Sequence, residues 1–585
     1  MANPSVQALI DSKRYNAALQ SIDLKNPVGA GVTVDQASTL IRSLVKRGQL
    51  KRAMDLSSSW LSQRKEDAEI WFLHGNAALR LGDVDSALES LHEADRLNPD
   101  QPLTLANLAV GYNSTDRHGK AMDLLDRALE INPRYAFAYQ KQGSILCRAG
   151  RVAEGVRAFE RAAMLTPKPE SMYARLLYWK NYLPDSDPAS LVGDAAAWGG
   201  RFTHQFEKGV GVHLNDLDHH RPLKVGFVSP DFCAHPVSFF VEPLFRGLDR
   251  SKYRIYAYSD VARPDKITET ISEMVDVFHH TAGKDIQTLA RLILNDQIDI
   301  LVDLAGHTGS GRLDLFHMRP APVQISWLGY PATTGSQGID YRLTDRHADP
   351  VGSSEAHYTE SLLRVDGGFL CYVPSERTPE PATVSPFEEN GFITFGSFNN
   401  LAKLSPQCID MWAEILSQVP DSRLMIKRRE LKDAWVRNHF IDHFAARGVK
   451  KDRLDFKTSQ TTLEGHLRNY ARIDIALDSF PYNGTTTNCE CLLMGIPVLT
   501  RKGGEHRSRV TASQLSSMGL QSWVTDSEDA YVARAVELAK NPEKIVPARK
   551  DLRSRFLTSP ITDAASFTRE LEQALLGMWH HGQGG

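Results

Sequence analysis

The feature that most constrains this chain is a repeat of 34 residues in its first third. Prolines recur at that spacing, and small residues recur with them at fixed places in each period. The positions that share the spacing are Pro99, Pro133 and Pro167; Ala94, Ala128 and Ala162; Gly48, Gly82 and Gly150; and Ala53, Ala87, Ala121 and Gly155. A fixed period of this length indicates one small structural unit stacked on copies of itself.

This spacing is typical of tetratricopeptide repeats, in which small residues let paired helices approach closely. We predict an α-solenoid over residues 1–167, with clear repeats from Val32 to Pro167 and a degenerate half-repeat near 15–27. Such a stack presents a concave surface that suits extended peptides, so we expect it to bind protein segments. A role as a dimerisation surface or folding cap is the alternative.

The whole chain is too long for one hydrophobic core. Its 585 residues, 42% hydrophobic and 24% charged, leave room for about three or four domains. The net charge of −3 argues against a general binder of nucleic acid or anionic membrane, and no apolar run reaches transmembrane length. There is no signal-peptide pattern, and the six cysteines form no disulfide framework. We therefore expect reduced thiols and a cytoplasmic location.

The pattern changes to alternating strands and helices at Leu223. After a helical bridge and linker over 168–222, such alternation fills two blocks, 223–385 and 386–585, around a Pro-, Ser- and Glu-rich stretch at 373–389. Apolar runs alternating with helical segments predict parallel sheets. The second half of the chain should therefore contain two Rossmann-like domains.

Three loops that follow predicted strands of the first block carry candidate residues. His235 and His307 each lie in a loop of small residues, and the third loop contains the turn Gly329, Tyr330 and Pro331. Ligands of doubly wound folds bind beyond the carboxyl ends of the strands, so we expect these loops to face one cleft. A histidine there could act as a proton or hydroxyl partner, although a lone histidine is more often structural.

A turn in the second block has the pattern of a phosphate-binding site. The segment Ile473–Thr500 predicts strand, tight turn, helix and strand, with the helix beginning near Asn488. A glycine permits the bend, three threonines precede a helix start that favours an anion, and an acidic residue one turn on could bind a sugar hydroxyl. These residues are Gly484, Thr485, Thr486, Thr487 and Glu490. An ordinary capped helix is the alternative.

A cation at another strand end of the second block suits the same ligand. Lys403 follows Asn399 and Asn400 directly after a predicted strand, where it could neutralise a departing diphosphate. A solvated surface lysine is the alternative. Two adjacent Rossmann-like domains with a phosphate site in the second describe the GT-B glycosyltransferase fold, in which a nucleotide-sugar donor lies between the domains.

The repeats and four further segments resemble the nucleocytoplasmic protein O-glycosyltransferases, the O-GlcNAc transferase and Spindly group of glycosyltransferase family 41. The segments are F-G-S-F-N-N-L-A-K, R-P-A-P-V-Q-I-S-W-L-G-Y-P-A-T-T-G, S-P-D-F-C-A-H-P and F-P-Y-N-G-T-T-T-N-C-E. The resemblance spans nearly the whole chain. It implies an α-solenoid followed by a GT-B fold, a nucleotide-sugar donor, and protein acceptors on the repeat surface.

The resemblance also implies roles for individual residues. It implies that His235 lies beside the acceptor hydroxyl, and that Lys403 holds the diphosphate. Further implied contacts are phosphate for Thr486 and Thr487, ribose for Glu490, and the base for His466. The remaining candidates are His307 as a catalytic residue and Asn400, Gly484, Thr485, Arg509 and the Gly329–Tyr330–Pro331 turn as donor-binding residues.

Some residues depart from the O-GlcNAc transferase pattern and leave the donor open. O-GlcNAc transferases have Gln, His and Asp in place of Asn400, Thr485 and Glu490, and a base-contacting Lys and Arg in place of Leu463 and Asn469. The segments F-G-S-F-N-N-L-A-K and G-T-T-T-N-C-E are nearer in sequence to the Spindly branch, which resembles a protein O-fucosyltransferase that uses GDP-fucose.

We therefore expect inverting transfer of a sugar to Ser or Thr of proteins, with GlcNAc from UDP-GlcNAc as the sugar implied by the resemblance. The alternatives are GDP-fucose, a flagellin-modifying transferase with another donor, or a repeat scaffold that senses a nucleotide sugar without turnover. No cofactor and no metal are expected, because no Asp-x-Asp pair ends a catalytic strand. The histidines and aspartates between His213 and Pro222 are expected to form a solvated linker. The general base and the oligomeric state stay open.

Overall fold

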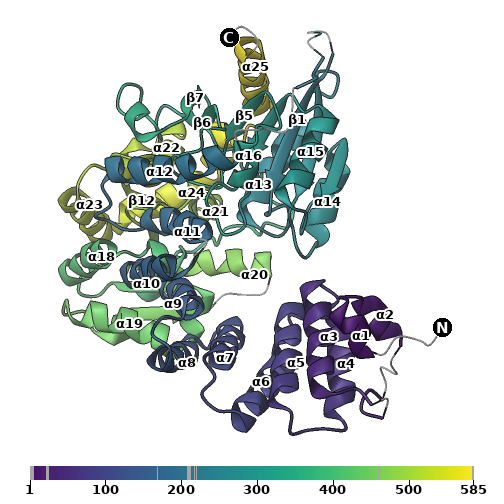
Figure 1. Ribbon diagram of the computed structural model, residues 1–585. Helices are drawn as coiled ribbons and strands as arrows, with labels where there is room; N and C mark the ends of the chain where they lie inside the picture. Colours follow the sequence, from purple (N-terminus) through teal and green to yellow (C-terminus); the bar gives the residue numbers. More distant parts are fainter. Residues whose placement is uncertain are drawn as a thin grey trace. The chain divides into compact units, whose positions relative to one another are not determined.

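A computed structural model describes residues 6–582, apart from 22–25, 30, 168, 207–212, 217, 219–220 and 459–461 (Figure 1). The chain divides into two compact units. One holds Met1–Pro169 with Lys432–Asn438, and the other holds Glu170–Leu431 with His439–Gly585. No helix among the described residues combines the length and apolar composition needed to span a bilayer.

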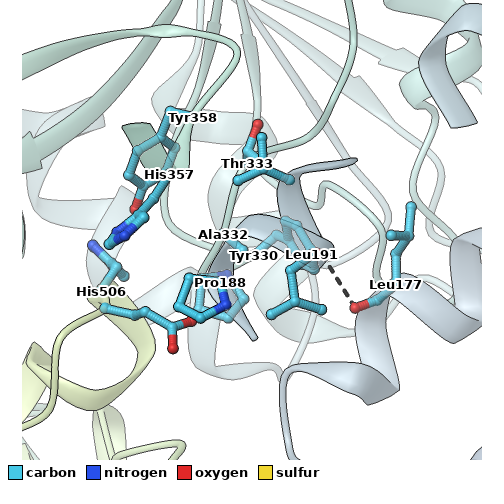
Figure 2. A pocket seen from close by; sticks show the side chains of 12 residues that line it. Leu177, Pro188, Leu191, Tyr330, Ala332, Thr333, His357, Tyr358 and His506 are labelled. Atoms are coloured by element: carbon cyan, nitrogen blue, oxygen red, sulfur yellow. Dashed lines mark hydrogen bonds between the residues drawn. The ribbon is translucent and has the colours of Figure 1, made fainter. Parts of the chain in front are cut away.

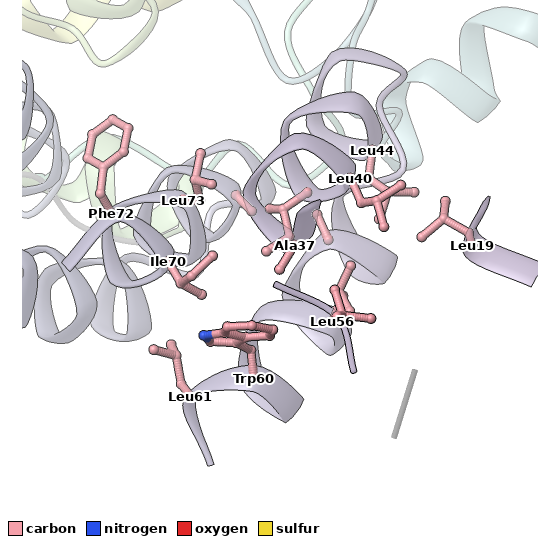
Figure 3. Close-up of a cluster of buried hydrophobic side chains, with 14 of the residues drawn as sticks. Leu19, Ala37, Leu40, Leu44, Leu56, Trp60, Leu61, Ile70, Phe72 and Leu73 are labelled. Atoms are coloured by element: carbon pink, nitrogen blue, oxygen red, sulfur yellow. The ribbon is translucent and has the colours of Figure 1, made fainter. Parts of the chain in front are cut away.

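The first unit is built from helix pairs, each packed on the next. The helices are α1 (Val6–Asp11), α2 (Tyr15–Gln20), α3 (Val34–Lys46), α4 (Leu50–Leu61), α5 (Ala68–Leu81), α6 (Val84–Leu97), α7 (Pro102–Ser114), α8 (His118–Ile131), α9 (Ala136–Arg148) and α10 (Val152–Leu165). Figure 3 shows how side chains of successive helices share one core, with Leu40 of α3, Leu56 and Trp60 of α4, and Ile70 of α5 among its members. The core therefore runs along the stack, as expected of a repeat array.

The 34-residue spacing has a packing reason at each of its positions. Ala53, Ala87 and Ala121 are 0% exposed because they lie where paired helices meet. The spaced glycines follow the first helix of a pair in the left-handed conformation that glycine favours, as Gly82 does with φ +84. Asp116 takes the equivalent place with φ +58. The predicted α-solenoid is thus confirmed.

The second unit begins with the helical bridge, α11 (Glu170–Lys180) and α12 (Pro188–Phe206). Of the linker residues, His213 Nε2 donates to the carbonyl of Arg319 at 2.7 Å, and Arg221 forms an ion pair with Asp299 at 2.6 Å. His219 and His220, part of the sequence stretch expected to be a solvated linker, lie outside the described residues.

The first Rossmann-like domain contains a parallel sheet in the order β3-β2-β1-β4-β5-β6-β7. Its strands are β1 (Leu223–Ser229), β2 (Tyr253–Ser259), β3 (Val277–His280), β4 (Ile300–Asp303), β5 (Val323–Ser326), β6 (Tyr341–Asp345) and β7 (Ser361–Val365). Helical segments connect them: α13 (Pro236–Gly247), α14 (Lys266–Met274), α15 (Ile286–Asp296), α16 (Leu313–His317) and η1 (Glu355–His357). The central strands are buried almost continuously, because helices cover both faces of such a sheet.

The second Rossmann-like domain contains a parallel sheet in the order β10-β9-β8-β11-β12-β13. Its strands are β8 (Thr394–Ser397), β9 (Arg423–Lys427), β10 (Leu454–Lys457), β11 (Ile475–Leu477), β12 (Val498–Arg501) and β13 (Val524–Thr525). Its α-helices are α17 (Pro386–Asn390), α18 (Pro406–Gln418), α19 (Ala434–Ala445), α20 (Leu463–Arg468), α21 (Thr486–Leu493), α22 (Val510–Ser517), α23 (Glu528–Lys540) and α24 (Ile545–Leu557). Short 3-10 helices complete it: η2 (Leu401–Lys403), η3 (Arg429–Lys432), η4 (Lys451–Arg453), η5 (Asn469–Arg472), η6 (His506–Ser508), η7 (Gln521–Trp523), η8 (Pro542–Lys544) and η9 (Pro560–Thr562).

The last helix, α25 (Ala564–Gly582), packs against the first Rossmann-like domain. The hydroxyl of Tyr253 donates to the carbonyl of Glu572 at 2.8 Å, and the ring of Phe567 stacks 5.9 Å from that of Trp327. The sequence-based boundary at residue 386 placed this helix with the second domain. Its apolar face is instead covered by the first sheet and α13.

Candidate functional site

The turn between β11 and α21 is held in shape by a buried aspartate. Asp478 is 2% exposed and accepts hydrogen bonds from the backbone N–H of Gly484 at 2.8 Å, from the amide of Asn488 at 3.1 Å and from the hydroxyl of Thr500 at 2.8 Å. A Cβ at position 484 would lie 2.6 Å from the Asn488 amide oxygen, so the turn needs glycine there. The Asp478 carboxylate thus stabilises the conformation of the turn.

Helix α21 begins at Thr486, two residues earlier than the sequence indicated. Thr485 takes the N-cap position, and in the described structure its side chain makes no capping hydrogen bond. No acidic residue lies in the first turn of this helix as described. The half-buried start of α21 therefore presents uncapped N–H groups and the positive end of the helix dipole, which together favour an anion.

Lys403 lies against the same turn. Its Nζ donates to the carbonyl of Asn483 at 2.6 Å and lies 4.1 Å from the centre of the Tyr482 ring. Burial lowers the pKa of Lys403 to about 8, against an opposing effect of Asp478. Asn400 caps η2 by accepting from the N–H of Ala402 at 3.1 Å. The structure thus brings the predicted cation and the predicted phosphate turn together.

His466 and Glu490 also meet, although 24 residues separate them. His466 Nε2 lies 3.0 Å from a Glu490 oxygen, which also accepts from the Tyr470 hydroxyl at 2.8 Å. The other ring nitrogen, Nδ1, lies 2.5 Å from Nζ of Lys427. Sequence reasoning missed Lys427, whose only signal was its place as the last residue of a predicted strand.

The helical bridge reaches the phosphate turn, which the sequence did not predict. The ring of Tyr182, just after α11, packs 4.6 Å from the ring of Tyr482. The guanidinium of Arg507 donates to the carbonyl of Asn181 at 2.8 Å. The cluster of aromatic residues in this part of the sequence was the signal available.

His235 lies at the start of α13 and caps it. Its Nδ1 accepts from the N–H of Val237 at 3.4 Å, and Asp231 lies 3.7 Å from the same nitrogen. Burial lowers the pKa of His235, and the Asp231 carboxylate opposes that effect. The side chain remains 43% exposed, so a substrate can reach the ring.

His307 has a different environment from the one expected. It is 3% exposed, its Nε2 donates to the carbonyl of Thr334 at 2.7 Å, and the ring of Trp198 packs 4.5 Å away. Burial lowers its pKa to about 4, so the imidazole is neutral. We expected this side chain to face one cleft with His235 and the Gly329–Tyr330–Pro331 turn, but Trp198 of α12 packs on it, and its contacts are those of a structural histidine.

Tyr330 likewise points toward the bridge. Its hydroxyl donates to the carbonyl of Leu177 at 3.3 Å (Figure 2). The same hydroxyl accepts from the amide of Asn181 at 3.0 Å. With Pro331 it lines a cavity of about 20 Å³ between the bridge and both Rossmann-like domains. That volume holds about one water molecule, far less than a nucleotide sugar needs. Gly329 is required by packing, because a Cβ there would collide with the carbonyl of Leu304.

Arg509 holds two loops together. Its Nε donates to the carbonyl of His347 and its Nη1 to that of Gly503, both at 2.9 Å. Of the predicted residues, Lys403 and Gly484 lie at the turn before α21, Thr485, Thr486 and Thr487 lie at the start of that helix, and His466 contacts its Glu490. Arg509, His307 and the Gly329–Tyr330–Pro331 turn make structural contacts instead.

Comparisons with known proteins agree with this architecture. A sequence profile of glycosyl transferase family 41 matches residues 206–372 and 387–571, and a tetratricopeptide-repeat profile matches 68–101. A solved structure of a lysine-to-methionine mutant of the Thermobaculum terrenum O-GlcNAc transferase is 32% identical, with a TM-score of 0.82 over 88% of this chain and 98% of that one. This likeness confirms the predicted fold class, an α-solenoid followed by a GT-B fold.

Several curated relatives are plant proteins. A protein of Hordeum vulgare named probable UDP-N-acetylglucosamine–peptide N-acetylglucosaminyltransferase SPINDLY is 40% identical over 68% of this chain and 42% of its own length. A protein of Arabidopsis thaliana, named probable UDP-N-acetylglucosamine–peptide N-acetylglucosaminyltransferase SEC, is 30% identical over 65% of this chain and 39% of its own length. The chain thus spans less than half the length of these relatives. Because the profile matches more than half of its residues, the chain belongs to glycosyl transferase family 41.

Proposed function

We propose that this chain is a protein O-glycosyltransferase that moves a sugar from a nucleotide-sugar donor to a Ser or Thr hydroxyl, with inversion at the anomeric carbon. The observation that carries the proposal is the meeting of the Lys403 ammonium with the turn and the uncapped start of α21. A positive side chain beside a helix N-terminus suits a diphosphate. Family membership and the names of the relatives support the reaction class.

In the proposed reaction, the acceptor oxygen bonds to the anomeric carbon while the bond from that carbon to the diphosphate oxygen breaks. Negative charge grows on the departing diphosphate. Lys403 and the first N–H groups of α21 stabilise that charge more strongly in the transition state than in the bound donor. Their positions are fixed before the reaction, so little reorganisation is needed.

In this scheme, the neutral ring of His235 acts as a hydrogen-bond donor. Its Nδ1 accepts from a backbone N–H, so a neutral ring carries its proton on Nε2. Asp231, at 3.7 Å, is beyond hydrogen-bond distance and does not hold a proton on Nδ1. We propose that His235 orients the acceptor or sugar, and that the hydroxyl proton leaves to the donor phosphate or a water chain.

UDP-GlcNAc is the first donor to test, because the names of the relatives describe UDP-N-acetylglucosamine enzymes. GDP-fucose is the alternative donor, because the segment that contains Thr485 and Glu490 is nearer in sequence to the Spindly branch. The test incubates the full chain with UDP-GlcNAc, GDP-fucose and other nucleotide sugars together with Ser- and Thr-containing peptides. Nucleoside diphosphate release and the mass added to the peptide are measured together, with Lys403→Ala as the matched negative control.

Each outcome of this panel assigns one function. An added mass of one sugar identifies the donor, and a sugar other than GlcNAc or fucose points to a flagellin-type transferase. Tight donor binding without release or added mass favours a nucleotide-sugar sensor, the second class of function that this fold could serve. If no nucleotide sugar binds, the proposed donor site is wrong.

We also propose that transfer needs no metal ion. Lys403 and the helix start supply the positive charge that a divalent cation supplies in metal-dependent transferases. Transfer should therefore continue in excess EDTA, measured as product formed per minute. A loss of activity that Mn²⁺ or Mg²⁺ restores would contradict this part of the mechanism.

The proposed acceptors are proteins bound through the repeats, and the proposed location is the cytoplasm. All six cysteines are free, which suits a reducing compartment. The repeats are helix pairs packed one on the next, an arrangement that presents an extended surface to peptides in repeat proteins.

A further inference from the structure

Lys427 is a buried lysine that the proposed mechanism does not use. It ends β9 next to the proposed donor site and is 2% exposed. In the described part of the chain no carboxylate forms an ion pair with it; its contacts are Nδ1 of His466 and the ring of Phe398, 5.1 Å away. The Glu490 carboxylate favours the charged lysine only from beyond ion-pair distance. Burying an ammonium without a carboxylate in direct contact is costly, so its placement here needs a reason.

The hydrogen bonds around His466 allow a single assignment of protons. The ammonium of Lys427 can only donate, so Nδ1 of His466 must accept and carry no proton. The ring proton then lies on Nε2, which donates to the Glu490 carboxylate. A doubly protonated ring would direct an N–H at the ammonium. The opposite tautomer would place two acceptors, Nε2 and the carboxylate, against each other.

The geometry points to Lys427 as a positioning residue for donor recognition: it fixes the tautomer and orientation of His466, and through His466 it fixes Glu490. The Nε2–H of His466 and the hydroxyl of Tyr470 both bind the same oxygen, Oε2. Oε1 is thereby left to accept a hydroxyl of the nucleoside. Lys427 itself is too buried to contact the donor directly.

This inference rests on the proposed function, because it assigns Lys427 to the nucleoside side of the same donor. It differs from the role of Lys403, which lies on the diphosphate side. Removing Lys427 should weaken binding of a nucleoside diphosphate and leave binding of inorganic pyrophosphate unchanged. Removing Lys403 should weaken both.

The first test uses Lys427→Met in the full chain, which keeps the length of the side chain and removes its donor. Calorimetry measures the affinity for UDP, GDP and pyrophosphate, and turnover gives KM and kcat for the donor. We expect about a tenfold loss of nucleoside diphosphate affinity and a similar rise in donor KM. We expect kcat and pyrophosphate affinity to change by less than about twofold.

The matched control is Lys457→Met. Lys457 pairs with Lys427 across β10 and β9, so it occupies the equivalent place on the neighbouring strand. It forms an ion pair with Asp455 and makes no contact with His466 among the described residues. Binding and turnover of this variant should match the unmodified chain. Circular dichroism and the thermal transition establish that each variant is folded.

A double-mutant cycle tests whether Lys427 acts through His466. In a His466→Ala background, Lys427→Met should cause no further loss of nucleoside diphosphate affinity. A loss of the same size in both backgrounds, or an equal loss for pyrophosphate, would show a direct or general electrostatic effect and overturn the inference. Unchanged affinity in folded Lys427→Met would overturn it as well. If the unmodified chain binds neither UDP nor GDP, the proposed function fails first, and this inference fails with it.

Discussion

Lys403 carries a charge that its protein contacts do not neutralise. Its ammonium donates to the neutral carbonyl of Asn483 and lies over the ring of Tyr482. Burial lowers its pKa to about 8, which shows that the free site favours the charged form less than water does. In the proposed function, a phosphate that enters the site provides the partner that the protein does not supply. This is how a site fixed in advance stabilises a leaving group.

Replacing this lysine should damage catalysis more than folding. We expect Lys403→Ala to lose about 3 kcal/mol of transition-state stabilisation, a fall in kcat/KM of more than about a hundredfold. Steady-state kinetics measures the loss, and the thermal transition should stay close to that of the unmodified chain. Near-normal turnover by a folded variant would remove Lys403 from the mechanism.

The same residue predicts a dependence of donor binding on pH. Lys403 is charged below pH about 8 and loses its proton as the pH rises further. Affinity for a nucleoside diphosphate should therefore be near its maximum at about pH 7, one unit below that pKa, and fall as the pH rises above about 8. Calorimetry across this range measures the fall.

Lys427 also has a pKa lowered by burial to about 8. The fall in affinity at alkaline pH must therefore be assigned to one of the two lysines. Pyrophosphate separates the two lysines, because only Lys403 is proposed to lie on the diphosphate side. We expect pyrophosphate affinity to fall above pH about 8 in the Lys427→Met variant as it does in the unmodified chain. Affinity that is level up to pH about 10 in both proteins would contradict the assignment to Lys403.

At the scale of elements, the repeat helices depend on how closely their backbones approach. Gly143 of α9 faces Phe159 of α10, and a Cβ built on Gly143 would lie 2.9 Å from that ring. The ring is 0% exposed, so it has no free space to move into. Gly193 of α12 offers the opposite case, because it is exposed and has nothing within 4 Å of a Cβ.

These two glycines should respond in opposite directions to the same substitution. We expect Gly143→Ala to destabilise the repeats by about 1–3 kcal/mol through overpacking. Gly193→Ala should stabilise its helix by about 0.5–1 kcal/mol, because it removes backbone entropy from the unfolded state. Hydrogen exchange of α9, α10 and α12 measures each change locally. Faster exchange in α12 of Gly193→Ala, or no change in α9 and α10 of Gly143→Ala, would contradict this reading of the packing.

The elements also show what could be predicted from sequence and why. The repeat was readable because alanines such as Ala87 are buried wherever two helices meet, so the packing rule repeats in the sequence. The turn before α21 could be predicted because Gly484 is required by a local bend of the chain. The environment of His307 could not be predicted, because Trp198, which covers it, is 109 positions away in the chain. Lys427 was missed because its only local signal was its place at the end of a predicted strand, and its role depends on His466 in helix α20.

At the scale of the molecule, contacts between distant segments complete the second unit. The bridge touches the phosphate turn through Tyr182 and Tyr482, and α25 returns to the first Rossmann-like domain after the second is complete. Neither contact leaves a pattern in a single sequence, because packing partners this far apart have no fixed spacing. The turn before α21 therefore has a packing partner in the helical bridge that the sequence did not indicate.

The first unit divides from the second in a way that can be tested. No candidate donor residue lies in Met1–Pro169 or Lys432–Asn438. If the repeats recognise proteins, a chain that lacks residues 1–167 should keep its affinity for a nucleoside diphosphate and its turnover of short peptides. Its turnover of whole-protein acceptors should fall, because binding energy remote from the reacting atoms is lost.

The truncation also removes the repeat partners of Lys432–Asn438, so it needs a control in the full chain. Asp433 accepts from the N–H of Gly119 at 3.0 Å, and the guanidinium of Arg151 lies 5.0 Å from the ring of Trp435. Trp435→Ala tests whether disturbing this segment alone changes turnover. We expect it to keep short-peptide turnover and nucleoside diphosphate affinity, as the folded truncation should. Equal losses for peptide and protein acceptors in the truncated chain, or lost nucleotide affinity, would show that the repeats support the fold and do not select the acceptor.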